Sequence, residues 1–274
     1  MKLTYYGTGA GEGWPGLFCS CRLCEEARRL KGKNIRTRSQ ALINDDLLID
    51  LTPDTNMHCL VYGLKLEKID HLLVTHSHSD HFYPPDLELL REPFAHNHPN
   101  IFNIYGNDSV RERVWTGVPK VNEVEDRFCF HRAELFRPIA IKDYTVVPLR
   151  ALHDRKEECL FYQITQGDKT ILYAHDTGFF PDDTMNYLKE HRRHLDLVSL
   201  DCTTQSEEDG KNHMGLADAV KEKQRLISLG LADDSTKWVV NHFSHNGLWL
   251  HDQMVEEAKK VGFMVSYDTM EIEI

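Results

Sequence analysis

One segment constrains this chain more than any other. Residues 75–82 read Thr-His-Ser-His-Ser-Asp-His-Phe and directly follow an apolar run. His76 and His78 point the same way on an extended backbone, because side chains repeat every two residues, and a turn then brings Asp80 and His81 to a second position nearby. Imidazole and carboxylate suit Zn²⁺, Mn²⁺ or Fe²⁺, and four such groups exceed what one open catalytic ion requires. The segment therefore predicts a metal centre with more than one ion.

Further ligands of the same chemical type follow in order along the chain. His153 comes after the run 144–149, Asp176 stands in Ala-His-Asp-Thr-Gly, and His242 follows the run 238–241. Taken singly, each is more typical of a hydrogen-bonded structural residue at a strand end. Their joint occurrence downstream of the first segment favours one shared site, in which the carboxylate of Asp176 bridges two ions.

Three cysteines form a second candidate cluster. Cys19, Cys21 and Cys24 stand at positions i, i+2 and i+5, and the chain holds seven cysteines, an odd number that does not suggest a disulfide framework. Three thiolates close around one Zn²⁺ when a fourth ligand completes the tetrahedron, and His245 is the candidate for that place. The alternative is a set of unpaired thiols near the surface.

Composition limits the class of protein. The 274 residues are 41% hydrophobic and 27% charged, without repeats or a long linker, so we expect a single domain over 1–274. No apolar run approaches the roughly 18 residues of a membrane span, and the first residues lack the apolar stretch of a secretory signal, so a cytoplasmic protein is expected. The formal net charge of −11 argues against nucleic acid as a partner. It does not exclude an anionic substrate, because bound divalent ions reverse the local field.

Apolar, β-branched runs predict many strands, and amphipathic stretches predict helices between the later ones. The expected strands are 3–6, 41–43, 47–49, 71–75, 101–105, 144–147, 160–164, 170–174, 197–200 and 238–240. The expected helices are 182–195, capped by Asp182 or Asp183, then 218–229 and 253–261. This order predicts an α/β fold of two packed sheets with helices outside. Most of the candidate ligands follow a strand, which is where sites gather in such sheets.

The Thr-His-Ser-His-Ser-Asp-His segment, followed by His153, Asp176 and His242, resembles the metallo-β-lactamase superfamily over essentially the whole chain. The resemblance implies a four-layer αββα sandwich with two metal ions at one edge. It assigns the first ion to His76, His78 and His153, the second to Asp80, His81 and His242, and the bridging place to Asp176.

The cysteine cluster, together with His-x-x-His at 242–245, resembles the PhnP branch of that superfamily, as do Gly7-Thr8-Gly9 and the stretch 49–54. These proteins are phosphodiesterases that open a phosphoribosyl cyclic phosphate. The resemblance implies that a zinc ion held by Cys19, Cys21, Cys24 and a histidine is structural. We assign His242 to catalysis and His245 to the zinc because His242 lies nearer the strand end; the reverse assignment is the alternative.

His213, in Lys-Asn-His-Met-Gly, resembles the loop histidine that donates a proton in PhnP and ribonuclease Z enzymes. Such a donor suits a departing alkoxide, and Asp201 could orient the ring. The resemblance thus implies a hydrolase with two Mn²⁺ or Zn²⁺ ions, a metal-bound hydroxide as nucleophile, and His213 and Asp80 as catalytic residues. The expected substrate is a small phosphodiester, with a cyclic ribosyl phosphate as one candidate, and the expected assembly is a homodimer. An exposed loop histidine is the alternative for His213.

Other reactions share this metal-binding pattern. A ribonuclease Z-like tRNA-processing enzyme usually has Gly where this chain has Ser79, and carries a basic arm that is not evident here. A thioesterase or lactonase of the glyoxalase II type would not need the cysteine cluster or His213. A non-enzymatic metal-binding or redox module is the remaining class, and flavodiiron proteins place Glu where His78 stands.

Overall fold

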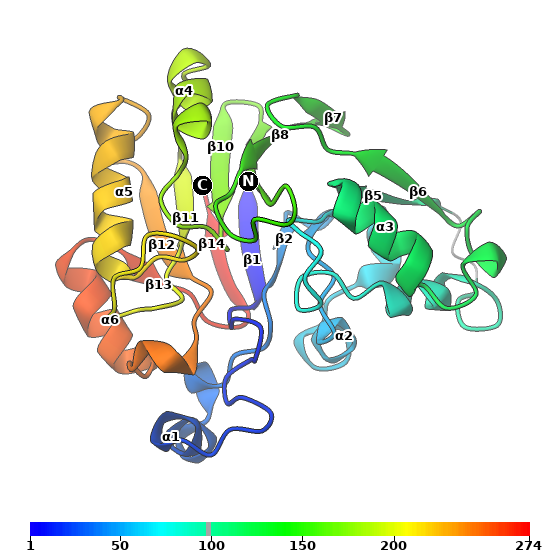
Figure 1. Ribbon diagram of the computed structural model, residues 1–274, viewed down its shortest axis with the longest axis horizontal. Coiled ribbons are helices and arrows are strands. Elements are labelled where there is room, and N and C mark those ends of the chain that lie inside the picture. The colour runs from blue at the N-terminus through cyan, green and yellow to red at the C-terminus, as the bar shows by residue number, and fades with distance from the viewer. Residues whose placement is uncertain (97–99) are drawn as a thin grey trace.

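Two seven-stranded sheets form the framework of the computed structural model, which describes residues 1–96 and 100–274 (Figure 1). The first sheet has the order β14-β1-β2-β3-β4-β5-β6 and the second β13-β12-β11-β10-β9-β8-β7. The strands of the first sheet are β1 (Lys2–Gly7), β2 (Gln40–Ile43), β3 (Leu47–Ile49), β4 (His71–Leu73), β5 (Phe102–Gly106), β6 (Phe128–Arg132) and β14 (Met270–Glu273). Those of the second are β7 (Ile139–Ile141), β8 (Tyr144–Arg150), β9 (Leu160–Gln166), β10 (Lys169–Ala174), β11 (Leu197–Asp201), β12 (Lys237–Asn241) and β13 (Met264–Val265).

Parallel pairing brings the strand ends together. In the first sheet β3, β4, β5 and β6 run parallel, with Ile49 opposite Leu73. In the second sheet β10, β11, β12 and β13 run parallel, with Ala174 opposite Leu200. Because parallel strands end at the same edge, the segments that follow β3, β4, β10, β11 and β12 are neighbours there.

Helices cover the outer face of each sheet. The helices are α1 (Arg22–Leu30), α2 (Thr55–Tyr62), α3 (Asp108–Gly117), α4 (Asp182–Glu190), α5 (Leu216–Ser228) and α6 (His251–Lys260). The short 3₁₀ helices are η1 (Gly32–Asn34), η2 (Leu66–Lys68), η3 (Pro84–Leu90), η4 (Val121–Glu123) and η5 (His245–Gly247). In Figure 1, α4, α5 and α6 lie on the left and α2 and α3 on the right. Within the two described stretches, no helix has both the length and the apolar character required to cross a bilayer.

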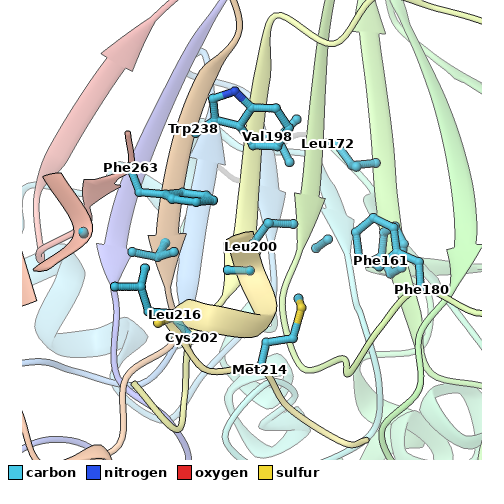
Figure 2. Packing of buried hydrophobic residues seen from close by; sticks show 14 of the residues in the cluster. Phe161, Leu172, Phe180, Val198, Leu200, Cys202, Met214, Leu216, Trp238 and Phe263 are labelled. Carbon is cyan, nitrogen blue, oxygen red and sulfur yellow. The ribbon is translucent and has the colours of Figure 1, made fainter. Parts of the chain in front are cut away.

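Three apolar cores separate four layers. A central core between the sheets contains Tyr5, Tyr162 and Tyr173, all fully buried. One outer core joins the first sheet to α3 through Val110 and Val114. The other joins the second sheet to α1, α4, α5 and α6, and Figure 2 shows part of it. These layers confirm the predicted αββα sandwich.

The sequence located the strands that lead into the site, but not every element. All ten predicted strands are present, with ends shifted by up to three residues, whereas β6, β7, β13 and β14 were not predicted. The helix predicted over 182–195 ends at Glu190, because the chain must leave it to enter β11, and its N-cap residue is Pro181 rather than an aspartate. Helices α1, α2 and α3 were also missed: α2 and α3 have only a weak amphipathic pattern, whereas the pattern of α1 is strong and was overlooked beside its cysteines.

Truncating the outer core should destabilise the fold. Leu172 of β10 is fully buried in the core that Figure 2 shows. We expect Leu172→Ala to lower the free energy of unfolding by about 2–5 kcal/mol, through lost burial and the cavity left behind. Denaturant unfolding measures the change. Leu60→Ala is the matched control, because that side chain is 79% exposed and should shift stability by less than about 0.5 kcal/mol. Equal effects of the two variants would contradict the assigned core.

Candidate metal centre

The histidine-rich segment lies at the end of β4, between the two sheets. Backbone hydrogen bonds fix its ends: Leu160 N of the second sheet donates to Thr75 O at 2.9 Å, and Leu51 N donates to His81 O at 2.8 Å. His76 and His81 are buried, with 1% exposure each, whereas His78 lies at the rim. The local backbone therefore directs two imidazoles inward and leaves one facing the entrance.

One group of three histidines meets at this rim. His76, His78 and His153 each offer a ring nitrogen, and these atoms lie within 4.8 Å of one another. The ring of His76 is centred 4.5 Å from that of His78 and 4.9 Å from that of His153. Three imidazoles at this separation can hold one divalent ion and leave a coordination position open.

A second group is built around Asp176. Its Oδ2 lies 2.7 Å from His81 Nε2 and 3.0 Å from His242 Nε2, and Asp80 Oδ2 lies 3.3 Å from the same His81 nitrogen. The other carboxylate oxygen, Oδ1, is 3.6 Å from His153 Nε2. Asp176 therefore faces both groups, which is the geometry of a carboxylate that bridges two ions.

The buried nitrogen and oxygen atoms at the centre of this site are arranged as ligands for metal ions, not as a satisfied hydrogen-bond network. His76 Nε2, His81 Nε2, His242 Nε2 and Asp176 Oδ2 are all buried, and apart from the contacts of His81 and His242 with the Asp176 and Asp80 carboxylates none of them has a partner among the described residues. Leaving a buried polar atom unpaired costs about 1–3 kcal/mol, and one carboxylate oxygen does not satisfy several imidazole nitrogens at once, so the cluster favours a shared cation. A nitrogen and oxygen donor set of this kind suits Zn²⁺ or Mn²⁺.

The outward nitrogens of the buried histidines are held by the protein. Thr75 Oγ1 lies 3.0 Å from His76 Nδ1 and 3.0 Å from Asp50 Oδ1, so the hydroxyl can accept from the ring and donate to the carboxylate. His81 Nδ1 donates directly to Asp50 Oδ2 at 2.7 Å. Such contacts fix each tautomer and aim Nε2 at the metal position.

Asp50 supports two residues of the histidine-rich segment, and the sequence analysis gave it no role. It follows β3, is fully buried, and also accepts from the backbone N–H of Thr75 at 2.9 Å. Its φ of 66° is left-handed, as are those of Asp176 at 48° and His242 at 67°. Non-glycine residues adopt this region at a cost of about 1–3 kcal/mol each, and strain of that kind clusters at active sites. The sequence signals for Asp50 were its place after an apolar run and its position in the stretch 49–54 that resembles the PhnP branch, and neither gave it a role.

His213 lies beside both groups and is oriented by Asp201. Its Nδ1 donates to Asp201 Oδ2 at 3.0 Å, and its ring is centred 4.9 Å from that of His153. Although burial opposes the charge, the Asp201 carboxylate raises the pKa of His213 to about 9. Asp201 also accepts from the backbone N–H of Asp176 at 3.0 Å, so it holds the proposed bridging residue as well.

The three predicted cysteines form a separate cluster with His245. The three sulfurs and one nitrogen of His245 lie within 4.8 Å of one another, and Cys21 Sγ is 3.5 Å from His245 Nδ1. Backbone hydrogen bonding from Cys24 lowers the pKa of Cys21 to about 6, which favours the thiolate. Three sulfurs and one imidazole are a donor set for tetrahedral Zn²⁺. The structure thus places His242 with the histidine–aspartate groups and His245 with the cysteines.

Asp50 should affect metal binding without touching the metal. We expect Asp50→Asn to weaken retention of the ions about 10–100-fold, because His81 Nδ1 and Thr75 lose their charged acceptor. Competition with a chelator, followed by metal analysis, measures the change. Asp46→Asn, which alters a surface carboxylate paired with Lys142, is the control and should bind metal normally. Unchanged metal retention in Asp50→Asn would remove this role.

The cysteine cluster should account for one ion per chain. We expect Cys21→Ser to lose one zinc equivalent, because a hydroxyl replaces one of four ligands, and to retain the ions of the histidine–aspartate groups. Elemental analysis of the purified protein gives the stoichiometry. Cys129→Ser, at an exposed position outside the cluster, should retain all ions. Equal metal content in the two variants would exclude the cysteine site.

Several solved structures share the architecture of this chain. A diphosphatase from the PhnP family superposes with a TM-score of 0.74 at 23% identity, covering 100% of this chain and 96% of that one. Zn²⁺-bound PqqB from Methylobacterium extorquens superposes with a TM-score of 0.75 at 18% sequence identity, and the match covers 100% of both chains. The short form of human tRNase Z superposes with a TM-score of 0.65 at 18% sequence identity, and the match covers 100% of this chain and 99% of that one. At these identities the likeness establishes the fold.

Sequence comparison identifies the family. An octanoyltransferase from Porphyromonas gingivalis is 30% identical over 170 residues, which are 57% of this chain and 31% of that protein. The chain thus spans about a third of the length of this curated relative. The family model described as a beta-lactamase superfamily domain matches residues 46–228, which include the His76–His81 segment, His153, Asp176 and His213. The chain belongs to the beta-lactamase superfamily of metal-dependent hydrolases.

Proposed function

We propose that this protein is a phosphodiesterase of the PhnP-like branch, acting on a small phosphodiester with two divalent ions and His213 as the proton donor. His76, His78 and His153 would hold one ion, and Asp80, His81 and His242 the other, with Asp176 between them. Bound Zn²⁺ or Mn²⁺ would supply an activated water and neutralise charge on the phosphoryl oxygens. Support comes from the two ligand groups that Asp176 joins.

The position of His213 is the observation that favours phosphodiester hydrolysis over the other reactions of this superfamily. Its Nδ1 is fixed by Asp201, and its Nε2 makes no hydrogen bond to any described residue. The side chain remains 24% exposed, so Nε2 is accessible to a substrate. An imidazolium held by a buried carboxylate can protonate a departing alkoxide, which is the poor leaving group of an alkyl phosphodiester. A thioester needs this help less, because a thiolate leaves readily.

The cysteine cluster is a second argument for this branch. It lies outside the histidine–aspartate groups, so its expected ion is structural and takes no part in the reaction. A PhnP-family diphosphatase is also among the proteins that share the fold over the whole chain. Transfer RNA is a less suitable substrate, because a chain with a formal net charge of −11 would repel a polyanion of that length.

Replacing the proposed donor should separate catalysis from metal binding. We expect His213→Ala to retain all metal ions and to lose a factor of about 10²–10⁴ in kcat, because the leaving oxygen no longer receives a positioned proton. Assays with bis(4-nitrophenyl) phosphate and a 2′,3′-cyclic nucleotide measure the loss, which should be larger for the cyclic nucleotide because its alkoxide is the poorer leaving group.

His191→Ala is the control, since that imidazole is exposed at the end of α4 and bonds its own helix. A panel of thioester, lactone and precursor tRNA substrates tests the other reactions. Hydrolysis of the thioester alone would overturn the proposed function in favour of a glyoxalase II-type reaction. Full phosphodiesterase activity in His213→Ala would remove that residue from the mechanism.

A further inference from the structure

A polar pocket lies on the outer face of the second sheet, beside the segment that follows α4. It has a volume of about 560 Å³. It is lined by Thr145 of β8, Gln163 and Thr165 of β9, Thr170 of β10, and the segment 191–194. Pockets that bind small molecules usually have volumes of about 300–1,000 Å³, so this one is large enough for such a ligand.

The floor of this pocket is polar, whereas the rest of the same sheet face is apolar. Side chains alternate between the two faces of a strand, so Phe161, Gln163 and Thr165 of β9 share the outer face. Phe161 belongs to the outer core that also contains Met185 and Leu188 of α4. Gln163 and Thr165 line the pocket instead. The change from apolar to polar side chains thus marks a part of the face that is built for a polar ligand.

Gln163 faces the pocket without a partner from the protein. The residue is only 6% exposed, yet its side-chain amide makes no hydrogen bond with any residue that the structure describes. An amide carries N–H donors and an acceptor oxygen. Because Gln163 lines the pocket, the partners of these groups must come from the pocket itself.

Two arginines border the pocket, and the protein neutralises neither of them. Arg192 and Arg193 are exposed, and within the described ranges neither forms an ion pair or a side-chain hydrogen bond. One carboxylate also lines the pocket, that of Asp168 in the turn between β9 and β10, and it forms no ion pair with either arginine. Two positive charges against one negative charge give a local field that attracts anions, in a chain whose formal net charge is −11.

The segment that carries both arginines is fixed at its two ends. His191 N donates to Tyr187 O at 2.9 Å, and the two rings stack with their centroids 4.0 Å apart. Asp196 N donates to Thr170 O at 2.9 Å, and the Asp196 carboxylate accepts from Thr170 N at 2.9 Å. The arginines are therefore anchored to the same strand that supplies part of the floor, which lowers the ordering cost of binding a ligand.

The pocket and the metal centre lie at opposite ends of the second sheet. Thr145 and Thr170 stand close to the first residues of β8 and β10, and the segment 191–194 precedes β11. By contrast, His153 and Asp176 follow the last residues of β8 and β10. A ligand in the pocket would therefore not be the molecule that reacts at the metal centre.

We propose that this pocket binds the phosphate group of a small molecule, at a site separate from the metal centre. Arg192 and Arg193 would bind the phosphate oxygens through their N–H groups, and the Gln163 amide would donate a further hydrogen bond. A phosphate group suits this set of donors better than a carboxylate, because it offers more acceptor oxygens. The inference goes beyond the proposed function and does not depend on it.

Calorimetric titration of the metal-loaded protein with glucose 6-phosphate, inorganic phosphate and glucose tests the site. We expect both phosphate compounds to bind and glucose not to bind. Arg192→Ala and Arg193→Ala should each raise Kd about tenfold, and Gln163→Met about threefold, with metal content unchanged. Asp168→Asn should lower Kd about twofold, because it removes the opposing charge. A lower Kd for glucose 6-phosphate than for inorganic phosphate assigns the site to a phosphate ester, and equal values assign it to free phosphate.

Lys189→Ala is the charge-matched control, because it removes an exposed cation of α4 that does not line the pocket. Phosphate bound at the metal ions would persist in all these variants, so the event that the arginine variants weaken is the one assigned to the pocket. Equal weakening in Lys189→Ala would show a general charge effect and overturn the site. Unchanged binding in both arginine variants, binding of glucose as tight as that of glucose 6-phosphate, or no binding of either phosphate compound would also overturn it.

Discussion

The Asp176 carboxylate is the group on which the rest of the site depends, because it meets side chains from both sheets. Its Oδ2 lies 2.7 Å from His81 Nε2, which follows β4 of the first sheet, and 3.0 Å from His242 Nε2, which follows β12 of the second. These separations exist only while the two sheets keep one relative position. The central core supplies that constraint, together with a hydrogen bond of 2.6 Å from Tyr162 of the second sheet to Val74 O of the first. The fold thus controls the site through the packing between sheets, more than through either sheet alone.

The two sheets support their histidines in the same way. In the first, the Thr75 hydroxyl lies between His76 Nδ1 and the Asp50 carboxylate. In the second, the Thr203 hydroxyl lies 2.8 Å from His242 Nδ1 and 3.2 Å from Asp201 Oδ2. Each arrangement lets a buried carboxylate act on an imidazole without contacting it, and each carboxylate is fully buried. The two carboxylates differ in one respect: burial raises the pKa of Asp50, whereas the imidazoles of His213 and His242 lower the pKa of Asp201 in spite of its burial. A carboxylate charge beside the imidazole makes it a stronger metal ligand.

The sequence singled out most of the side chains that the structure brings together, but it located the elements that support them less completely. The histidine-rich segment carries four candidate ligands within six residues, and the structure places them close to His153, Asp176 and His242, although His78 faces the entrance while His76 and His81 are buried. Spacing could not reveal Asp50, since its relation to His81 depends on the pairing of β3 with β4 across 31 residues of chain. The pattern also missed β13 and β14. The first has two residues, and the second alternates Met-Glu-Ile-Glu at a sheet edge, so neither forms an apolar run.

The segment between His242 and His245 explains how two candidate metal sites can lie so close in the chain and remain separate. Phe243 N donates to Thr8 O at 2.9 Å, and Ala10 N donates to Phe243 O at 3.0 Å. The buried guanidinium of Arg36 lies 4.2 Å from the centroid of the Phe243 ring and donates to Thr8 Oγ1 at 2.8 Å. None of these contacts uses a residue of either ligand group. The backbone beside His242 is therefore held by the end of β1 and by Arg36, independently of the cysteine cluster. An ion at the candidate cysteine site would accordingly not be needed to hold His242 in place.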